Sequence, residues 1–304
     1  MRLIYFTESY PYGIGQEWKK NELNVLKEYF DEIIVVPFKY QSNKIPQPAI
    51  QGIKYSLPIS SFFQYKQKSF LSLLSIFSSN RIFIYLEEFF IHKVYLSISK
   101  LKQWYYSTYL IENLVRNPIL FDLLINSHVP TIAYFFWGRN TSEIITVLKN
   151  PIIKSCIRLH RYDLYDYTYS TNYIPYQKSQ LLNSNLIISV SNDGKEYLQK
   201  KYSTFQSKIN IKVLRLGTLD EGLSRESDDT TLRIISCSFI KKVKRVTLIA
   251  EALSYIFDVN IIWTHIGDGP EKESVINYIS SFPQNIQCNI IGWVDPPDVK
   301  AFYV

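Results

Sequence analysis

A cluster of cations stands at the start of an expected helix near the end of the chain. The run Lys-Lys-Val-Lys-Arg at 241–245 follows an expected strand, 232–238, and its last two residues, Lys244 and Arg245, precede an amphipathic helix, 246–255. Cations at a helix start add to the positive end of the helix dipole and to its unpaired N–H groups. A diphosphate is a natural ligand for this arrangement, although a charge run by itself is more often a solvated face.

A glycine loop follows the next expected strand, 259–265. It contains Gly267, Asp268 and Gly269. Glycines allow a ligand to approach the backbone closely, and the carboxylate accepts hydrogen bonds from hydroxyls or bases. Gly-Asp-Gly is usually only a turn. Because the loop and the basic run belong to one βαβ unit, together they are a moderately specific signal for a phosphate-containing ligand.

A third group of polar residues follows an expected strand at 152–159. His160 begins it, followed by Arg161, Asp163 and Asp166. Open α/β sheets bind ligands just beyond the carboxyl ends of their strands. A single histidine is more often structural than catalytic, but the clustering and the position at a strand end favour a functional role. We therefore treat His160 as a candidate catalytic residue.

Two glycines near the amino terminus lie where a nucleotide-binding fold places them. Gly13 and Gly15 separate an expected strand, 2–7, from an expected helix, 17–29. The dinucleotide fingerprint is incomplete because Trp18 stands where a third glycine would be, so no nicotinamide cofactor is expected. The loop could admit a phosphate or a sugar at the helix start. The alternative is a simple turn that joins strand to helix.

The elements that must position these residues alternate between strands and helices, which predicts an α/β fold with parallel sheets. Near-continuous apolar runs indicate strands that are buried on both faces. They occur at 2–7, 33–38, 131–137, 152–159, 186–190 and 211–214. A polar, acidic stretch without apolar periodicity follows. We expect a first domain over 1–220, a linker over 221–231 and a second domain over 232–304.

Charge is divided unevenly between the two halves. Up to residue 216 there are 26 basic and 15 acidic residues, and from Gly217 onward 8 basic and 12 acidic ones. Between residues 60 and 126, lysines alternate with bulky aromatic residues in a strongly helical region. This pattern suits an interfacial helix on anionic lipid, and it also suits single-stranded nucleic acid or an ordinary helical layer with a wet face. No recognised nucleic-acid module is present, so no nucleic acid is expected as a partner.

The sequence shows no transmembrane segment, no signal peptide and no paired cysteines. No apolar run reaches the length of a spanning helix, and the first residues do not resemble a signal peptide. The three cysteines, Cys156, Cys237 and Cys288, are far apart and are expected to be buried thiols in a reducing compartment. We expect a cytoplasmic protein, peripheral to the inner face of the membrane.

Several catalytic motifs are also missing. The chain has no Asp-x-Asp pair, no His/Cys cluster at metal-ligand spacing, no Gly-x-Ser-x-Gly and no Walker loop. These absences argue against metal-dependent sugar transfer, zinc or serine hydrolysis and NTP hydrolysis. Accordingly, neither a metal nor a cofactor is expected.

The chain resembles the retaining GT-B glycosyltransferases of the "group 1" family, especially those that build bacterial surface polysaccharides. The similarity is strongest from Arg233 onward. The segments that carry it are 236–239, 243–246, 251–253, 263–270 and 292–294, together with 10–17, 158–165 and 189–195 in the first half.

The resemblance implies two facing Rossmann-like domains and transfer of a sugar without a metal, with retention of the anomeric configuration. The nucleotide-sugar donor would be a co-substrate held mainly by the second domain, and the acceptor would be a polyprenyl-linked glycan. In this resemblance Lys244 matches a lysine on the donor diphosphate, and Gly267–Gly269 lie beside the nucleotide. Gly13 and Gly15 match a loop near the donor phosphates and the acceptor, and His160 matches a histidine near the transferred sugar.

The sequence departs from the family pattern in two places. Ser238 stands where many relatives carry an arginine that also contacts the diphosphate, and Lys241 or Lys242 could supply that charge. Relatives continue beyond the position of Val304 into a loop with two glutamates, which grip the sugar and the ribose, and a closing helix. We therefore expect a second domain that is incomplete. The alternative to an active enzyme is an inactive remnant or a non-catalytic binding partner.

Overall fold

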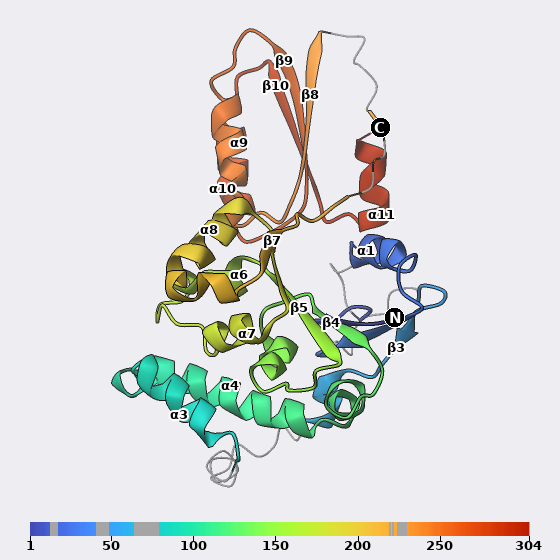
Figure 1. Cartoon of the computed structure of the whole chain (residues 1–304). Coiled ribbons are helices and arrows are strands. Elements are labelled where there is room, and N and C mark those ends of the chain that lie inside the picture. The colour runs from blue at the N-terminus through green and yellow to red at the C-terminus, as the bar shows by residue number, and fades with distance from the viewer. Residues whose placement is uncertain are drawn as a thin grey trace. The chain divides into compact units, whose positions relative to one another are not determined.

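The computed structural model describes residues 1–12, 18–40, 49–63, 79–218, 220, 222–223 and 230–303. The chain divides into two compact units, Met1–Leu219 and Asp220–Val304. Each unit combines a parallel β-sheet with helices (Figure 1). Gly13 and Gly15 lie outside the described residues.

The first unit is built on a seven-stranded parallel sheet with the order β3-β2-β1-β4-β5-β6-β7. The first six of these positions follow the Rossmann order 3-2-1-4-5-6. The strands are β1 (Arg2–Thr7), β2 (Glu32–Pro37), β3 (Lys54–Tyr55), β4 (Thr131–Phe135), β5 (Ile153–Leu159), β6 (Leu186–Ser189) and β7 (Ile211–Val213). Strand order reverses at β1, which pairs in parallel with both β2 and β4 from Arg2 onward.

Helices cover both faces of this sheet, so alternate side chains of β1 are buried in two different core clusters. Ile4 and Phe6 join one core cluster, whereas Leu3 and Tyr5 join another on the opposite face. All four are at most 2% exposed, which explains why the strand is a continuous apolar run. The helical segments are α1 (Lys19–Leu26), η1 (Ile59–Phe62), α3 (Ile82–Ile91), η2 (Val94–Leu96), α4 (Ile98–Arg116), α5 (Pro118–Leu120), η3 (Phe121–Ile125), η4 (Asn140–Thr146), α6 (Arg161–Leu164), η5 (Asp166–Thr168), α7 (Gln177–Asn183), α8 (Asn192–Lys201) and η6 (Ser203–Lys208).

The region rich in lysine and aromatic residues forms a helical layer with its own small core. Ser97 caps α4 by accepting a hydrogen bond from the Lys100 N–H at 3.3 Å. Tyr85 of α3 and Trp104 of α4 are buried in a cluster with Ile111. Other apolar side chains of the same layer remain exposed. Within the described ranges, no helix is long and apolar enough to cross a membrane.

The second unit has a three-stranded parallel sheet with the order β10-β9-β8. Its core lies on the side of α9 and α10, where Trp263 and Val275 are fully buried. The elements are β8 (Thr231–Cys237), η7 (Lys242–Lys244), α9 (Val246–Leu253), β9 (Asn260–Ile266), α10 (Lys272–Ile279), β10 (Ile286–Gly292), α11 (Pro296–Val299) and η8 (Lys300–Phe302).

The α/β fold with parallel sheets is confirmed, and most expected strands agree with the structure to within two residues. Neither β3 nor β10 was expected. The prediction of three buried thiols was wrong. Cys156 is buried, but Cys288 is partly exposed, and Cys237, the last residue of β8, is exposed.

Candidate functional site

His160 lies at the carboxyl edge of the large sheet, near the reversal of strand order. It directly follows β5, which pairs with β4. The chain beyond β4 is Phe136, Trp137 and Gly138, and the His160 ring packs against both aromatic rings. Its centroid lies 4.2 Å from that of Trp137 and 5.0 Å from that of Phe136. This is the edge where doubly wound sheets bind ligands.

A buried carboxylate joins the two strand ends. Asp163, which is 2% exposed, accepts a hydrogen bond from the Gly138 N–H at 2.6 Å and another from the His160 N–H. Its Oδ2 also lies 3.9 Å from Nδ1 of His160. Asp163 is the third residue of the first turn of α6, and this turn begins at His160. The ends of β4 and β5 are therefore fixed relative to each other through one side chain.

Gly138 allows this close packing. A Cβ atom at this position would lie 2.3 Å from Cδ2 of Leu159 and 3.1 Å from Cβ of Asp163. The His160 ring nitrogens are buried. Nδ1 lies on the side of Asp163, whereas Nε2 has no hydrogen-bond partner among the described residues. Because a buried polar atom without a partner is costly, Nε2 is suited to hydrogen-bond a ligand at the strand end.

A buried lysine, Lys19, lies near the same two aromatic rings that His160 contacts. Lys19 of α1 is fully buried, and its ammonium lies 4.6 Å from the Trp18 ring centroid and 4.7 Å from that of Phe136. Trp137 is 5.9 Å away. A cation over aromatic faces is attracted by the ring quadrupoles. The rings that contact His160 therefore also contact a positive charge.

Helix α1 is held against the sheet by Glu22. This carboxylate accepts hydrogen bonds from Tyr5 at 2.6 Å and Tyr134 at 3.0 Å, and it lies 3.1 Å from the guanidinium of Arg158. Burial, with the Glu22 charge as the next cause, raises the pKa of both tyrosines well above the ordinary value. They remain neutral donors and anchor the helix that carries Lys19.

In the second unit, the predicted basic run forms an exposed turn between β8 and α9. Lys244 closes η7, with its N–H bonded to the Lys241 carbonyl at 2.8 Å. Arg245 has a φ of 52°, in the left-handed region, and precedes the first residue of α9. Among the described residues, Lys242, Lys244 and Arg245 form no ion pair, so their charges are available to an anion.

The glycine loop packs directly on the chain that leads into this turn. A Cβ on Gly267, whose φ is 140°, would lie 2.0 Å from the Ser238 carbonyl oxygen, and one on Gly269 would lie 2.3 Å from that of Ile240. The Ile240 N–H donates to the Asp268 carbonyl at 3.0 Å. The structure therefore packs Gly267–Gly269 on the segment that leads into the basic turn, and the glycines allow this close contact.

The Asp268 side chain is exposed and points into its own loop. It accepts a hydrogen bond from the Gly269 N–H at 2.7 Å and lies 3.4 Å from the Lys272 ammonium. The first of these contacts, with the lysine as a smaller cause, holds the pKa of Asp268 below its ordinary value. Asp268 is thus an ionised, accessible acceptor at the loop.

His265 of β9 is satisfied within the core of the second unit. Its ring is fully buried, with Nδ1 2.8 Å from the Ser236 hydroxyl and Nε2 3.2 Å from the Ser238 carbonyl. Trp263 donates to the same hydroxyl at 2.9 Å. A neutral imidazole is satisfied in this setting, with Ser236 donating to Nδ1 and Nε2–H donating to the carbonyl. Burial lowers the pKa of His265, in agreement with this assignment.

Solved structures of several glycosyltransferases share this architecture. TarM matches with a TM-score of 0.59 and 9% identity, covering 99% of this chain and 78% of that chain. The lipopolysaccharide outer core galactosyltransferase WaaB matches with a TM-score of 0.53 and 13% identity, covering 99% and 71%. WaaG, a glycosyltransferase involved in lipopolysaccharide biosynthesis, gives 0.51 and 10%, covering 99% and 72%.

The chain has the GT-B fold. The resemblance to group 1 GT-B enzymes is thereby supported at the level of structure. No family model matches the chain, and no curated protein matches it by sequence. A second TarM structure, a mutant from S. aureus, matches with a TM-score of 0.44 and 11% identity, and the match covers 65% of this chain and 38% of that one.

The predicted site residues of this GT-B chain are distributed over both units. His160 belongs to the first unit, and Lys244, Arg245 and Gly267–Gly269 belong to the second. The sequence interpretation missed three residues at the His160 site: Lys19, Trp137 and Gly138. Gly138 could have been found, because a glycine directly after a buried strand marks a close approach at the strand end. Lys19 gave no signal, since a lysine near a helix start is usually solvated.

Proposed function

We propose that the chain transfers a sugar from a nucleotide-diphosphate sugar to a glycan acceptor in the synthesis of a bacterial surface polysaccharide. The observation that carries this proposal is the packing of the glycine loop on Ser238 and Ile240, which lead into the turn with Lys244 and Arg245. These cations are exposed and unpaired among the described residues, at the ends of parallel strands in a GT-B fold. The lipopolysaccharide enzymes among the structural matches support the choice of acceptor class.

In this proposal the second unit binds the donor diphosphate. Lys244 and Arg245 lie at the exposed start of α9, where a helix terminus also favours an anion. Gly267 and Gly269 allow their loop to pack on Ser238 and Ile240. The exposed Asp268 then accepts hydrogen bonds from the hydroxyls or the base of the nucleotide. Negative charge grows on the departing diphosphate as the reaction proceeds, so fixed cations lower the barrier electrostatically.

Transfer would proceed without a metal and with retention at the anomeric carbon. The acceptor hydroxyl oxygen forms a bond to the anomeric carbon while the bond to the diphosphate oxygen breaks, and the bonding electrons stay with the diphosphate. The hydroxyl proton passes to that departing oxygen. His160, whose Nε2 has no hydrogen-bond partner among the described residues, hydrogen-bonds the transferred sugar.

The direct test measures binding and turnover with a panel of nucleotide-sugars. Lys244→Ala should weaken donor binding by ~1.5–3 kcal/mol, the range for a hydrogen bond to a charged group. Lys212→Ala removes the same charge from an exposed position on β7 and should leave affinity unchanged. An unchanged affinity for the Lys244 variant would show that this lysine does not contact the donor. If no nucleotide-sugar binds, the proposed function is wrong, and binding without transfer favours a non-catalytic binding protein.

We also propose that the acceptor is lipid-linked and that the first unit rests on an anionic membrane. Exposed apolar side chains gather on α3, η2 and α4, and they are Phe83, Phe90, Tyr95, Leu96 and Ile98. Exposed Lys93 and Lys102 lie among them. Apolar side chains interleaved with lysines suit the interface of an anionic bilayer.

Co-sedimentation with vesicles tests this contact. Phe83→Ser together with Leu96→Ser should reduce binding to phosphatidylglycerol vesicles several-fold, because two of the most exposed apolar side chains of the layer are lost. Phe257→Ser alters a 71% exposed phenylalanine of the second unit and serves as the control. Equal binding to neutral phosphatidylcholine vesicles, or no effect of the paired substitution, would contradict the proposal.

A further inference from the structure

A large cavity lies at the amino-terminal edge of the first sheet. It has a volume of about 560 Å³ and is lined by residues of 80–84, 115, 125–128 and 144–152. Residues 127–128 precede β4, and residues 150–152 precede β5. His160 follows the opposite end of β5, seven residues away, which at roughly 3.3 Å per residue is about 23 Å. The cavity is therefore separate from the His160 site.

The wall of this cavity is mainly aliphatic. Ile144 is fully buried, and Val115, Val147 and Leu148 are half-buried around it. Ile84, Ile125 and Ile152 complete the apolar lining. Ligand cavities of about 300–1,000 Å³ with apolar walls and a few polar groups typically take small molecules. An aliphatic wall of this kind favours a hydrocarbon ligand.

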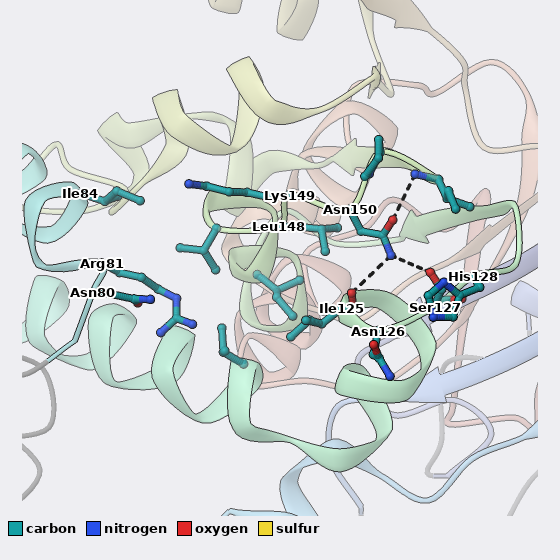
Figure 2. A pocket seen from close by; sticks show the side chains of 15 residues that line it. Asn80, Arg81, Ile84, Ile125, Asn126, Ser127, His128, Leu148, Lys149 and Asn150 are labelled. Atoms are coloured by element: carbon teal, nitrogen blue, oxygen red, sulfur yellow. Dashed lines mark hydrogen bonds between the residues drawn. The ribbon is translucent and has the colours of Figure 1, made fainter.

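The cavity lining also contains polar side chains, and two cations, Arg81 and Lys149, lie toward one end. In Figure 2, Arg81 and Lys149 lie toward one end of the cavity, with Asn80 beside Arg81, whereas Ser127 and His128 lie toward the other. Lys149 is exposed and has no ion pair among the described residues. Arg81 lies 3.2 Å from Glu112, but this buried carboxylate is also shared with Arg116 at 3.3 Å. Two arginines therefore share one carboxylate, and together with Lys149 they leave a net positive charge at this end.

The amide at the far side is already saturated. Asn150 Nδ2 donates to the carbonyls of Leu124 and Ser127, at 2.9 Å each, and these bonds close the loop before β5. Figure 2 shows the bond to Ser127 and a longer one to the Ile125 carbonyl, at 3.4 Å. The Asn150 side chain therefore builds the wall instead of binding a ligand. Arg81 and Lys149 remain the charged side chains that can reach a ligand at their end of the cavity.

We propose that this cavity binds one hydrocarbon chain whose end carries a phosphate group. The chain occupies the aliphatic wall around Ile144, and the phosphate lies between Arg81 and Lys149. At roughly 30 Å³ for a water-sized group, 560 Å³ holds on the order of a dozen or more methylene groups. Ile84 of α3 lines the cavity, and the same helix carries the exposed Phe83 and Phe90, so an amphiphile on an adjacent lipid surface would lie near it.

Titration calorimetry on the whole chain, without nucleotide, tests the proposal. The probes are lauroyl lysophosphatidic acid and farnesyl phosphate, with inorganic phosphate as the head group alone and dodecyl maltoside as a neutral chain. One or both lipid phosphates should bind with 1:1 stoichiometry, and the tighter one tells whether the ligand is a phospholipid or an isoprenoid. Absence of binding by both, or equal binding by either control probe, would overturn the proposal.

Two variants locate the bound probe. Lys149→Glu should weaken binding about tenfold or more, since it reverses the free cation at the rim, and Lys208→Glu makes the same change on exposed η6 as a control. Leu148→Trp should fill the cavity and abolish binding. Leu148 also packs on the core, so the folding of the Leu148→Trp variant is checked by circular dichroism. If Leu148→Trp does not fold, the binding measured for Lys149→Glu tests the proposal. Unchanged binding by Lys149→Glu would exclude this cavity. None of these outcomes depends on glycosyl transfer.

Discussion

In the first unit, the candidate His160 is held by buried contacts, whereas in the second unit the candidate Lys244 and Arg245 are exposed to water. Asp163 fixes the His160 backbone, and two aromatic rings fix its side chain. The basic turn has no such constraints on its charged ends among the described residues. The difference agrees with two tasks. A group that orients an uncharged sugar must be held in place, whereas a cation that attracts a diphosphate keeps its hydration until the ligand arrives.

The largest effect is expected from removing the buried carboxylate of the first unit. Asp163→Ala leaves the N–H groups of Gly138 and His160 without a partner, and each such loss costs about 1–3 kcal/mol. We expect a loss of about 3–5 kcal/mol in the free energy of unfolding of the first unit, measured by urea denaturation. The second unit should keep its stability in hydrogen exchange. Loss of stability in both units alike would contradict the independence of the two sites.

The next largest effect concerns the glycine contacts of the second unit. Gly267→Ala combines a left-handed φ with a Cβ 2.0 Å from the Ser238 carbonyl oxygen. We expect a loss of about 2–4 kcal/mol in unfolding free energy. Gly292→Ala has a similar sign of φ, 84°, but meets nothing within 4 Å, so it should cost only about 1–2 kcal/mol. Equal losses would show that the close approach of the two loops is unimportant.

The two units should also respond to pH in opposite directions. Burial raises the pKa of Glu88 in the first unit to about 7. The folded state therefore holds its proton more tightly than the unfolded state, and the first unit loses about 2–3 kcal/mol as pH rises from about 4.5 to about 7. The pKa of His265 in the second unit is lowered, so that unit loses stability as pH falls below about 6.5.

Hydrogen exchange resolved by unit, at pH 5 and pH 7, measures this contrast. Glu88→Gln should flatten the pH response of the first unit, because glutamine keeps the acceptor for Tyr173 and the Tyr176 N–H. The response of the second unit should not change. A steep response of the first unit that survives the substitution would assign it to another group.

The smallest expected effect is a difference between Lys244 and His160 variants in the salt dependence of donor affinity. Donor affinity should fall as the salt concentration rises from about 50 to about 500 mM. Salt screens exposed charges beyond the Debye length, which is about 10 Å at 0.1 M and shortens as salt is added. Lys244→Ala should reduce this salt dependence. His160→Gln should lower turnover and leave the salt dependence unchanged. A salt response that is identical in both variants would remove the electrostatic distinction between them.

Much of the fold could be predicted from local pattern. The expected bounds of β1 agree with the observed ones because both of its faces are buried, which makes it a continuous apolar run with clear ends. β3 has only two residues and β10 follows a polar turn, so neither produces a strong local signal. Their pairing depends on neighbours that are distant in the sequence, Ile34 for β3 and β9 for β10.

The candidate site was predictable in its strand-end residues and not in their surroundings. His160 and the basic run directly follow or precede regular elements, so their positions can be inferred from chain order. The contact of His160 with Trp137 joins two segments that are adjacent only because β4 pairs with β5. Lys19 is the extreme case, since its burial depends on Phe136, which lies far away along the chain.

The packing of Gly267 and Gly269 on the carbonyls of Ser238 and Ile240 has a thermodynamic consequence for any ligand of the second unit. Two backbones in direct contact cannot shift independently, so the loops on either side of the site are already ordered before a ligand arrives. Ordering a flexible loop on binding consumes part of the interaction energy. A diphosphate at this site would avoid that loss, and its association rate would depend on long-range attraction by the basic turn.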